Sequence, residues 1–343
     1  MQRGAAWPSR IAGPIGLRRD GSSVSIQTCR FLIRSSRAEA VSGRVAMNLD
    51  LDHMLSQTRK GQWSLDEIDW SAPLEGADAL SPRQRHEAGL ALLFTAGLER
   101  QAARIFRLAA RFADDERARR IYTLFDADEC RHAEAEIRLA RRYGARWRDL
   151  PLPTRAMFHA LSRDLERDDR GVHEFSAAII VLFELALDGI LIPTLRKQVR
   201  DPLQDEVFTR IDQDEARHLA MDYWLLDRKG QLFAAADAEA ALDRLVGHRS
   251  LARRLLGRAQ MMAGLAALLT AFAAMKLVVG DLHVRATEPE TVRRYLARVS
   301  AIPRRAPAAL AHPMYRSGLV GQRYVLGMLL AAAGRTPRLA AYA

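Results

Sequence analysis

A short pattern that occurs twice constrains the fold of this chain more than any other feature of its sequence. The segment apolar-Asp-x-Asp-Glu-x-Arg-His ends at His132 and again at His218, 86 residues later, and a lone glutamate precedes each copy at a similar distance. On an α-helix, residues three apart share a face, so the Glu and His of each copy can point at one target. The pattern predicts four helices whose side chains meet at a metal site. Its six residues are Glu99, Glu129, His132, Glu184, Glu215 and His218.

Both lone glutamates are predicted to join the same site. Glu184 lies in the apolar run 177–192, where burial of an unpaired carboxylate is costly, and a metal ion would supply a partner. The alternative is a side chain that points out of a half-buried helix. Glu99 follows another apolar run, and Arg100 beside it offers an ordinary surface ion pair instead. The spacing of the lone glutamates nearly matches that of the two motifs, which favours a ligand.

Carboxylates next to these residues also repeat. Asp126 and Asp212 each stand three residues before a motif glutamate, and we expect them to accept the free ring N–H of a ligand histidine. Asp128 and Asp214, with the arginines that follow, are expected to face elsewhere on the helix, in a solvated, ion-paired or functional role. Cys130 lies inside the first motif, but alanine stands at the matching position of the second, so a small packing residue is expected.

Capping residues indicate where the long helices begin. Ser81-Pro-Arg-Gln84 and Asp201-Pro-Leu-Gln204 each combine an N-cap side chain, a proline at the first helical position and a glutamine at the third. The link between the two motif halves is long enough to cross the bundle and to contain a helix at 154–168. The predicted main helices span 82–112, 114–143, 172–199 and 202–228.

Composition predicts one large all-α protein. With 343 residues, 49% of them hydrophobic, the chain can bury a substantial core, and it has neither a Gly-rich nucleotide fingerprint nor strand-like alternation. Two cysteines imply no disulfide framework, so a reducing compartment, the cytoplasm, is expected. We divide the chain into a leader (1–46), an N-terminal arm (47–80), the helical bundle (81–230) and a C-terminal helical extension packed on the bundle (231–343). Helices in the extension are predicted at 236–246, 249–280, 288–299 and 317–333.

The first 46 residues differ from the rest. They hold eight arginines and two acidic residues, which is typical of a disordered or transit-type leader, and a wrongly assigned start, with Met47 as the true first residue, fits equally. They carry +6 of the net charge of +11. The rest of the chain is mildly basic without a zinc motif or a basic aromatic patch, so no nucleic-acid partner is expected. A shallow basic surface for an acidic carrier protein stays open.

The apolar run 261–275 raises the question of a membrane span. It is rich in alanine and is closed by Lys276. It falls short of the ~20 strongly apolar residues that cross a bilayer. A buried helix that covers the bundle is the preferred prediction, and no membrane span is expected.

The six residues of the duplicated pattern resemble the ligand set of the ferritin-like di-iron carboxylate superfamily, over about residues 80–230. In that superfamily two helices each supply a glutamate and two each supply Glu-x-x-His. The resemblance implies a four-helix bundle with a long crossover, all six residues as ligands, and two iron ions, with manganese or a mixed Fe/Mn pair as alternatives. Its members include acyl-carrier-protein desaturases, multicomponent monooxygenases, aryl-amine N-oxygenases, ribonucleotide reductase small subunits, rubrerythrins and ferritins.

Single positions argue against some of these branches. Ribonucleotide reductase small subunits carry a radical tyrosine four residues after the first ligand histidine, where this chain has Glu136. Aryl-amine N-oxygenases carry a further histidine ligand four residues before the last ligand glutamate, where this chain has Ile211. Rubrerythrins need a cysteine-rich unit, and ferritins are usually much shorter.

The resemblance therefore implies an oxidoreductase that uses O₂ to hydroxylate, N-oxygenate or desaturate an apolar or aromatic substrate, free or bound to a carrier. Electrons would come from a separate ferredoxin or flavoprotein, and a homodimer is expected. Thr95, on the face of Glu99, is a candidate proton relay or a helix-packing residue, and Phe94, Leu98 and Phe183 are candidates for an apolar channel. The alternatives are a metal-storage, peroxidase or manganese-catalase-like protein, and a scaffold that keeps metal for stability.

Overall fold

The computed structural model describes residues 48–166, 170–235, 288–316, 318–320 and 322. Every regular element among them is helical and none is a strand, so the predicted all-α class is confirmed. The leader (1–46), the helices predicted at 236–246 and 249–280, and the apolar run 261–275 lie outside the described residues. Most of the helix predicted at 317–333 lies outside them as well.

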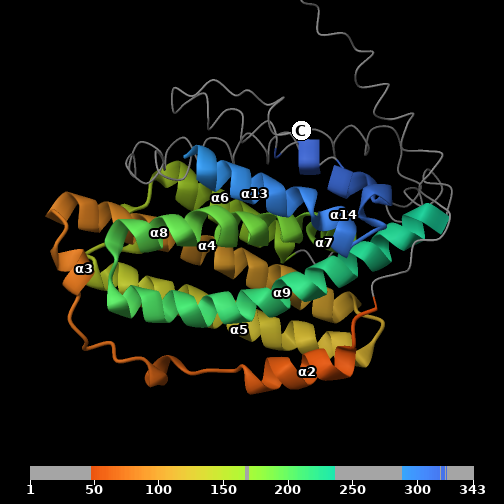
Figure 1. The fold of residues 1–343 in the computed structure, drawn as a ribbon, viewed down its shortest axis with the longest axis horizontal. Coiled ribbons are helices and arrows are strands. Elements are labelled where there is room, and N and C mark those ends of the chain that lie inside the picture. The colour runs from red at the N-terminus through yellow and green to blue at the C-terminus, as the bar shows by residue number, and fades with distance from the viewer. Residues whose placement is uncertain (1–47, 167–169, 236–287, 317, 321, 323–343) are drawn as a thin grey trace, which may run out of the picture. The chain divides into compact units, whose positions relative to one another are not determined.

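Long helices that carry the duplicated pattern pack together as a bundle (Figure 1). The segment with Glu184 is not a regular α-helix throughout, because α7 passes through a π-helical turn, η3, into α8. The helices predicted at 82–112, 114–143 and 172–199 are confirmed to within two residues, and the one predicted at 202–228 continues further. The observed bounds are α4 (Pro82–Phe112), α5 (Glu116–Arg142), α7 (Arg170–Ala186), η3 (Leu187–Leu191), α8 (Ile192–Val199) and α9 (Pro202–Ala235).

Local hydrogen bonds explain where α4 and α9 begin. The Ser81 side chain accepts the backbone N–H of Gln84 at 3.3 Å, and the Gln84 side chain accepts that of Ser81 at 3.2 Å, which is the predicted reciprocal cap. Asp201 likewise accepts two backbone N–H groups in the first turn of α9. Gln204 instead turns inward and accepts a hydrogen bond from the Tyr143 hydroxyl. Only half of the second predicted capping box therefore forms.

The crossover between α5 and α7 packs against α4. Gly144 ends α5 with a φ of 83°, a left-handed conformation that glycine adopts without a Cβ clash. The predicted crossover helix is α6 (Leu152–Leu165), whose Phe158 ring lies 5.6 Å from that of Phe94 on α4. A Cβ at Gly97 would come within 2.4 Å of the Phe158 ring, so this close approach requires glycine.

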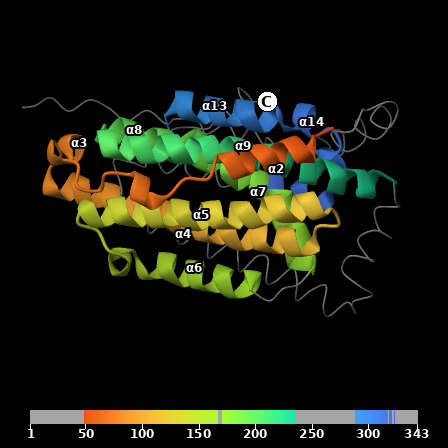
Figure 2. The ribbon, with the colours of Figure 1, turned by 90° about the horizontal axis from the view of Figure 1, so that it is seen from below.

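Segments before and after the bundle pack onto it. α2 (Leu51–Lys60) contacts α5 and α9, and α13 (Pro289–Ser300), close to the helix predicted at 288–299, contacts η3 and α7. Figure 2 shows α6 and α13 on opposite sides of the bundle. In the N-terminal arm, Trp63 and Trp70 pack against the core. The shorter described elements are η1 (Leu65–Glu67), α3 (Glu75–Asp78), η2 (Trp147–Asp149), α14 (Ile302–Arg305) and η4 (Ala309–Ala311).

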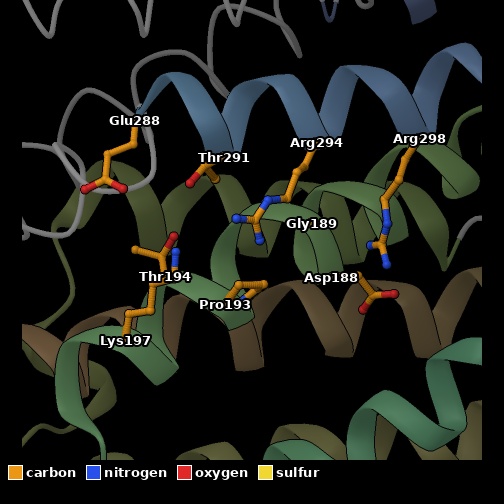
Figure 3. A pocket seen from close by; sticks show the side chains of 9 residues that line it. All are labelled: Asp188, Gly189, Pro193, Thr194, Lys197, Glu288, Thr291, Arg294 and Arg298. Carbon is orange, nitrogen blue, oxygen red and sulfur yellow. The ribbon is translucent and has the colours of Figure 1, made fainter.

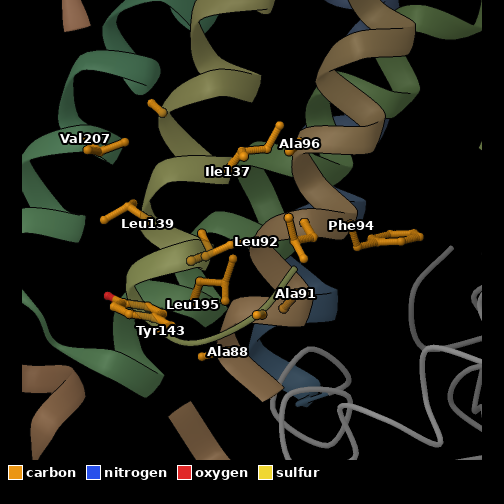
Figure 4. Packing of buried hydrophobic residues seen from close by; sticks show 14 of the residues in the cluster. Ala88, Ala91, Leu92, Phe94, Ala96, Ile137, Leu139, Tyr143, Leu195 and Val207 are labelled. Atoms are coloured by element: carbon orange, nitrogen blue, oxygen red, sulfur yellow. The ribbon is translucent and has the colours of Figure 1, made fainter. Parts of the chain in front are cut away.

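Apolar side chains fill the interior between α4, α5, α8 and α9 (Figure 4). Leu92 and Leu139 are fully buried, and Leu195 and Val207 meet them from α8 and α9. Removing a side chain of this size from water stabilises the fold by about 1.5–3 kcal/mol. This packing fixes the helices around the buried polar residues of the next section.

One described stretch, Arg170–Val199, is long and apolar enough to cross a membrane by length and composition alone. In the structure, 56% of its most apolar window is buried against the rest of the protein. Glu184 lies within it and has no exposed surface. A core helix of a bundle has the same apolar composition, because it is covered on most of its faces.

Candidate metal centre

All six residues of the duplicated pattern lie in the interior of the bundle. Each is at most 1% exposed. Such burial of charged side chains is rare unless they pair with one another or bind a cation. They are Glu99 of α4, Glu129 and His132 of α5, Glu184 of α7, and Glu215 and His218 of α9.

Interatomic distances show how closely these side chains cluster. One ligand atom from each of Glu99, Glu129, His132 and Glu215 lies within 4.8 Å of the others, so this buried group could hold a metal ion. The Glu215 carboxylate faces both imidazoles, with Oε1 3.2 Å from Nδ1 of His132 and Oε2 3.3 Å from Nδ1 of His218. Nδ1 of His218 also lies 2.9 Å from Oε1 of Glu129.

Glu184 lies near this group from the side of α7. Burial raises the pKa of Glu184 well above its usual range, and the charge of Glu215 raises it further. Both Glu184 oxygens are buried and have no hydrogen-bond partner among the described residues. The structure thus brings the second lone glutamate to the cluster rather than to the surface.

Most donor atoms in the cluster lack a hydrogen-bond partner. Both oxygens of Glu129, Glu184 and Glu215, and the Nδ1 atoms of both histidines, are buried and make no hydrogen bond of good geometry within the described part of the chain, although each Nδ1 lies close to a carboxylate oxygen. Buried polar groups are nearly always paired, and each unpaired one costs about 1–3 kcal/mol. A bound cation would satisfy them together, so the donor set fits a metal.

The pKa values of the buried glutamates and histidines also fit a metal site. Burial raises the pKa of Glu99 and Glu129. The charges of Glu99 and Glu215 raise the pKa of Glu129 further, whereas a hydrogen bond with Glu129 opposes the rise at Glu99. Burial alone would lower the pKa of His132, but the surrounding carboxylates raise it well above its usual range. Burial opposes the ionisation of Glu215, but the two histidines lower its pKa well below the usual range. A metal ion would displace the protons of the other groups on binding.

Each histidine contacts an aspartate of the other motif on its far side. Nε2 of His132 lies 2.9 Å from Oδ2 of Asp214, and Nε2 of His218 lies 3.4 Å from Oδ2 of Asp128. Donation of Nε2–H to these carboxylates leaves the Nδ1 lone pair free for a cation, as is usual for histidine ligands of metals. The two contacts cross between α5 and α9.

The prediction that Asp126 and Asp212 orient the histidines is wrong. Asp126 accepts two hydrogen bonds of 2.9 Å from Arg107, and Asp212 pairs with Arg196 at 2.8 Å. At about 100° per residue, the side chain four positions before a histidine lies roughly 40° from it around the helix, and the one six positions before lies roughly 120° away. The aspartates directly before the motif glutamates therefore face inward.

The N-terminal arm adds contacts that the duplicated pattern does not reveal. Nε1 of Trp63 donates to Asp214 at 2.8 Å, and the Gln62 amide donates to Asp128 at 2.8 Å. Both motif arginines pair with these aspartates, and the Arg131 guanidinium also lies 5.0 Å from the centroid of the Trp63 ring. Gln62 and Trp63 lie outside the repeat, so its spacing gives no signal for them.

Two further carboxyls are buried four residues after the histidines, Glu136 on α5 and Asp222 on α9. Neither has a hydrogen-bond partner among the described residues. Burial raises the pKa of both well above the usual range. Thr95 lies beside Glu136, but its hydroxyl donates to the Leu92 carbonyl at 2.9 Å. The equal spacing of the two acids is visible in the sequence and could have identified them.

The position of Cys130 differs from the expectation. Cys130 is exposed rather than packed, and its sulfur lies 4.0 Å from the outer carboxylate of Asp126. Phe94 and Leu98, which were candidates for a channel wall, are buried in the hydrophobic core, with Phe183 packed against it.

Comparison with known proteins adds no family assignment. No model of a known protein family matches the chain, and no curated protein matches it significantly. The functional argument therefore rests on the geometry of the buried cluster.

Proposed function

We propose that this protein is a ferritin-like di-iron oxidoreductase that uses O₂ to hydroxylate, N-oxygenate or desaturate an apolar or aromatic substrate. One observation carries the proposal: four carboxylates and two imidazoles meet in the bundle interior, and most of their donor atoms make no hydrogen bond of good geometry. Two helical pairs joined by a crossover, each with one lone Glu and one Glu-x-x-His, support a ferritin-like arrangement.

The donor set favours iron or manganese. Carboxylates suit manganese and imidazoles suit iron, and the mixed set is that of di-iron and di-manganese carboxylate bundles. Because Glu215 faces both imidazoles, it would hold the ions together with His132 and His218. We propose iron, with manganese or a mixed pair as the alternative.

The protein would hold these ions and exclude water from them. When bound, two iron ions supply open coordination positions and electrons for the reduction of O₂. Asp128 and Asp214 fix the histidine ring orientation from outside. Phe106 and Phe125 cover His218, with ring centroids 5.2 and 4.1 Å from that of the imidazole, and close this side with apolar surface.

Protons and electrons must also reach the site. Glu136 and Asp222, whose pKa values burial raises, would hold protons one helical turn past each histidine. Since the sequence has no nucleotide fingerprint, we propose that a separate ferredoxin or flavoprotein supplies electrons.

Anaerobic loading with Fe(II), followed by air and a chemical reductant, tests the function. We expect O₂ uptake coupled to oxidation of a lipid-like or aromatic substrate, and loss of both in Glu184→Ala. The matched control is Glu134→Ala, which removes a half-exposed carboxylate on α5 that pairs with Arg138 at 3.4 Å.

Two outcomes would support the alternatives instead. Accumulation of a mineral with many irons per chain indicates storage. Rapid disproportionation of H₂O₂ without oxidation of any substrate indicates a catalase-like protein. Either result would overturn the oxygenase proposal.

A further inference from the structure

A pocket lies where the π-helical turn η3 meets α13 (Figure 3). Its volume is about 160 Å³, which corresponds to roughly five water molecules at their volume in the liquid. None of the six metal-site residues lines it. Its charged lining residues are Asp188, Lys197, Glu288, Arg294 and Arg298.

The π turn and a glycine shape this pocket. A π turn inserts an extra residue into a helix, and such turns are frequent at functional sites. A Cβ at Gly189, within η3, would lie 3.6 Å from the Tyr295 ring and 3.8 Å from Nη1 of Arg298. A methyl group would fit there, but a longer side chain would enter the pocket. The missing side chain at Gly189 therefore keeps the space open.

Cations dominate the lining. In Figure 3 the side chains of Arg294 and Arg298 extend from α13 toward the π turn, and Lys197 lies on the side of α8. Arg294 also pairs with Glu290 at 3.0 Å. Both members of that pair are well exposed, so it is worth little in water and leaves the guanidinium able to bind another anion.

Asp188 contributes a polar group without a partner. Its Oδ1 is buried and has no hydrogen-bond partner among the described residues. Burial raises the pKa of Asp188 to about 8, with Glu215 adding to the rise and Arg298 opposing it. At neutral pH, this carboxyl is therefore mainly protonated and can donate a hydrogen bond. Among the described residues that line the pocket, the three cations then face the Glu288 carboxylate, and Glu290 outside the lining pairs with Arg294.

We propose that this pocket binds a small organic carboxylate. Arg294 and Arg298 present planar donors that match the two oxygens of a carboxylate. The bound anion would balance the excess positive charge and give the Asp188 carboxyl the partner that it lacks. The volume limits the ligand to a small acid. The site is separate from the metal cluster, so this binding does not depend on the proposed oxidation chemistry.

Titration calorimetry of the full-length protein with sodium benzoate tests the proposal. We expect saturable binding, no binding of benzamide, which has a similar shape without the charge, and weaker binding of inorganic phosphate. Arg298→Ala should weaken benzoate binding at least tenfold. Arg293→Ala, on the same helix but outside the lining, removes one exposed cation that pairs with Glu290 and should leave the affinity unchanged.

A second variant tests the shape of the pocket. Gly189→Leu should abolish benzoate binding while far-UV circular dichroism shows the helical fold intact. Unchanged affinity in Arg298→Ala, equal binding of benzamide, or tighter binding of phosphate would overturn the proposal. None of these readouts involves iron or O₂, so the failure of this proposal and the failure of the proposed function remain distinguishable.

Discussion

The buried cluster has two halves, each with one lone glutamate and one Glu-x-x-His motif. The residues that surround these ligands differ between the halves. α4 continues unbroken past Glu99, whereas the helix that carries Glu184 enters a π turn three residues later. Four residues before these glutamates stand Thr95 and Ile180. The two halves thus have the same inward Glu and His residues but different residues beside them. The pocket proposed to bind a small carboxylate lies beside the second half, at the π turn.

Glu215 connects the two halves, so its loss should have the largest effect. Glu215→Ala removes the carboxylate that faces both imidazoles, and we expect it to lose both metal ions. The Glu99 carboxylate lies 4.0 Å from Nδ1 of His132 and belongs to one half only. We therefore expect the Glu99→Ala protein to retain one ion. Metal analysis after Fe(II) loading and desalting measures the difference. Equal metal content in the two variants would refute the proposal that Glu215 helps to hold both ions.

The inner and outer aspartates give the next contrast. Asp214→Asn removes a carboxylate that contacts His132 and Trp63, and loss of such a partner weakens metal binding by about 10–100-fold. Asp212→Asn disturbs a partly exposed pair with Arg196, worth at most about 1 kcal/mol of unfolding free energy. Competition with a chelator measures both affinities. Equal weakening by the two substitutions would show that the inner position has no special role.

Buried acids should make the stability of the metal-free protein depend on pH. Burial raises the pKa of Glu136 well above its usual 4.5, so the folded state keeps a proton that the unfolded state releases. This contribution is fully present below about pH 4.5 and is lost as the pH rises toward the folded-state pKa. Glu136→Gln should flatten the fall in unfolding free energy between pH 5 and pH 8, measured with urea, and Asp222→Asn should act in the same way.

The control for this experiment is Glu134→Gln, two residues away on the outer side of α5, where the carboxylate pairs with Arg138 at 3.4 Å. It should leave the pH dependence unchanged. A Glu136→Gln protein with the same slope as the control would mean that this carboxyl is ionised in the folded state.

Trp63→Phe should have the smallest effect. The tryptophan ring stacks near His132, with ring centroids 6.3 Å apart, and its N–H donates to Asp214. Phenylalanine retains the ring and loses one hydrogen bond, worth about 1 kcal/mol. Metal binding should weaken by several-fold, less than in Asp214→Asn, because Arg217 still pairs with Asp214. An effect as large as that of Asp214→Asn would assign the orienting role to the tryptophan.

Properties that repeat along one helix could be predicted from the sequence. The start of α4 follows from its capping residues, and the inward direction of Glu129 and His132 follows from the helical period. Both depend on neighbours within a few residues, so no knowledge of the packing between helices is needed.

Contacts between helices could not be predicted in this way. Asp214 reaches His132 on α5, and Trp63 reaches Asp214 from the arm, because packing brings distant segments together. The sequence of the π turn Leu187–Leu191 predicts an ordinary apolar α-helix, because the extra residue of a π turn does not change the amino-acid composition. The pocket beside it depends on α13, about a hundred residues further along the chain, and thus on tertiary structure alone.

The iron content of the wild-type protein and of Glu184→Ala tests the central claim most directly. After anaerobic loading with Fe(II) and desalting, a centre shared by both halves of the pattern predicts two iron ions per wild-type chain and at most one in Glu184→Ala. A wild-type chain that retains no iron, or a Glu184→Ala chain that retains two with wild-type affinity, would contradict it.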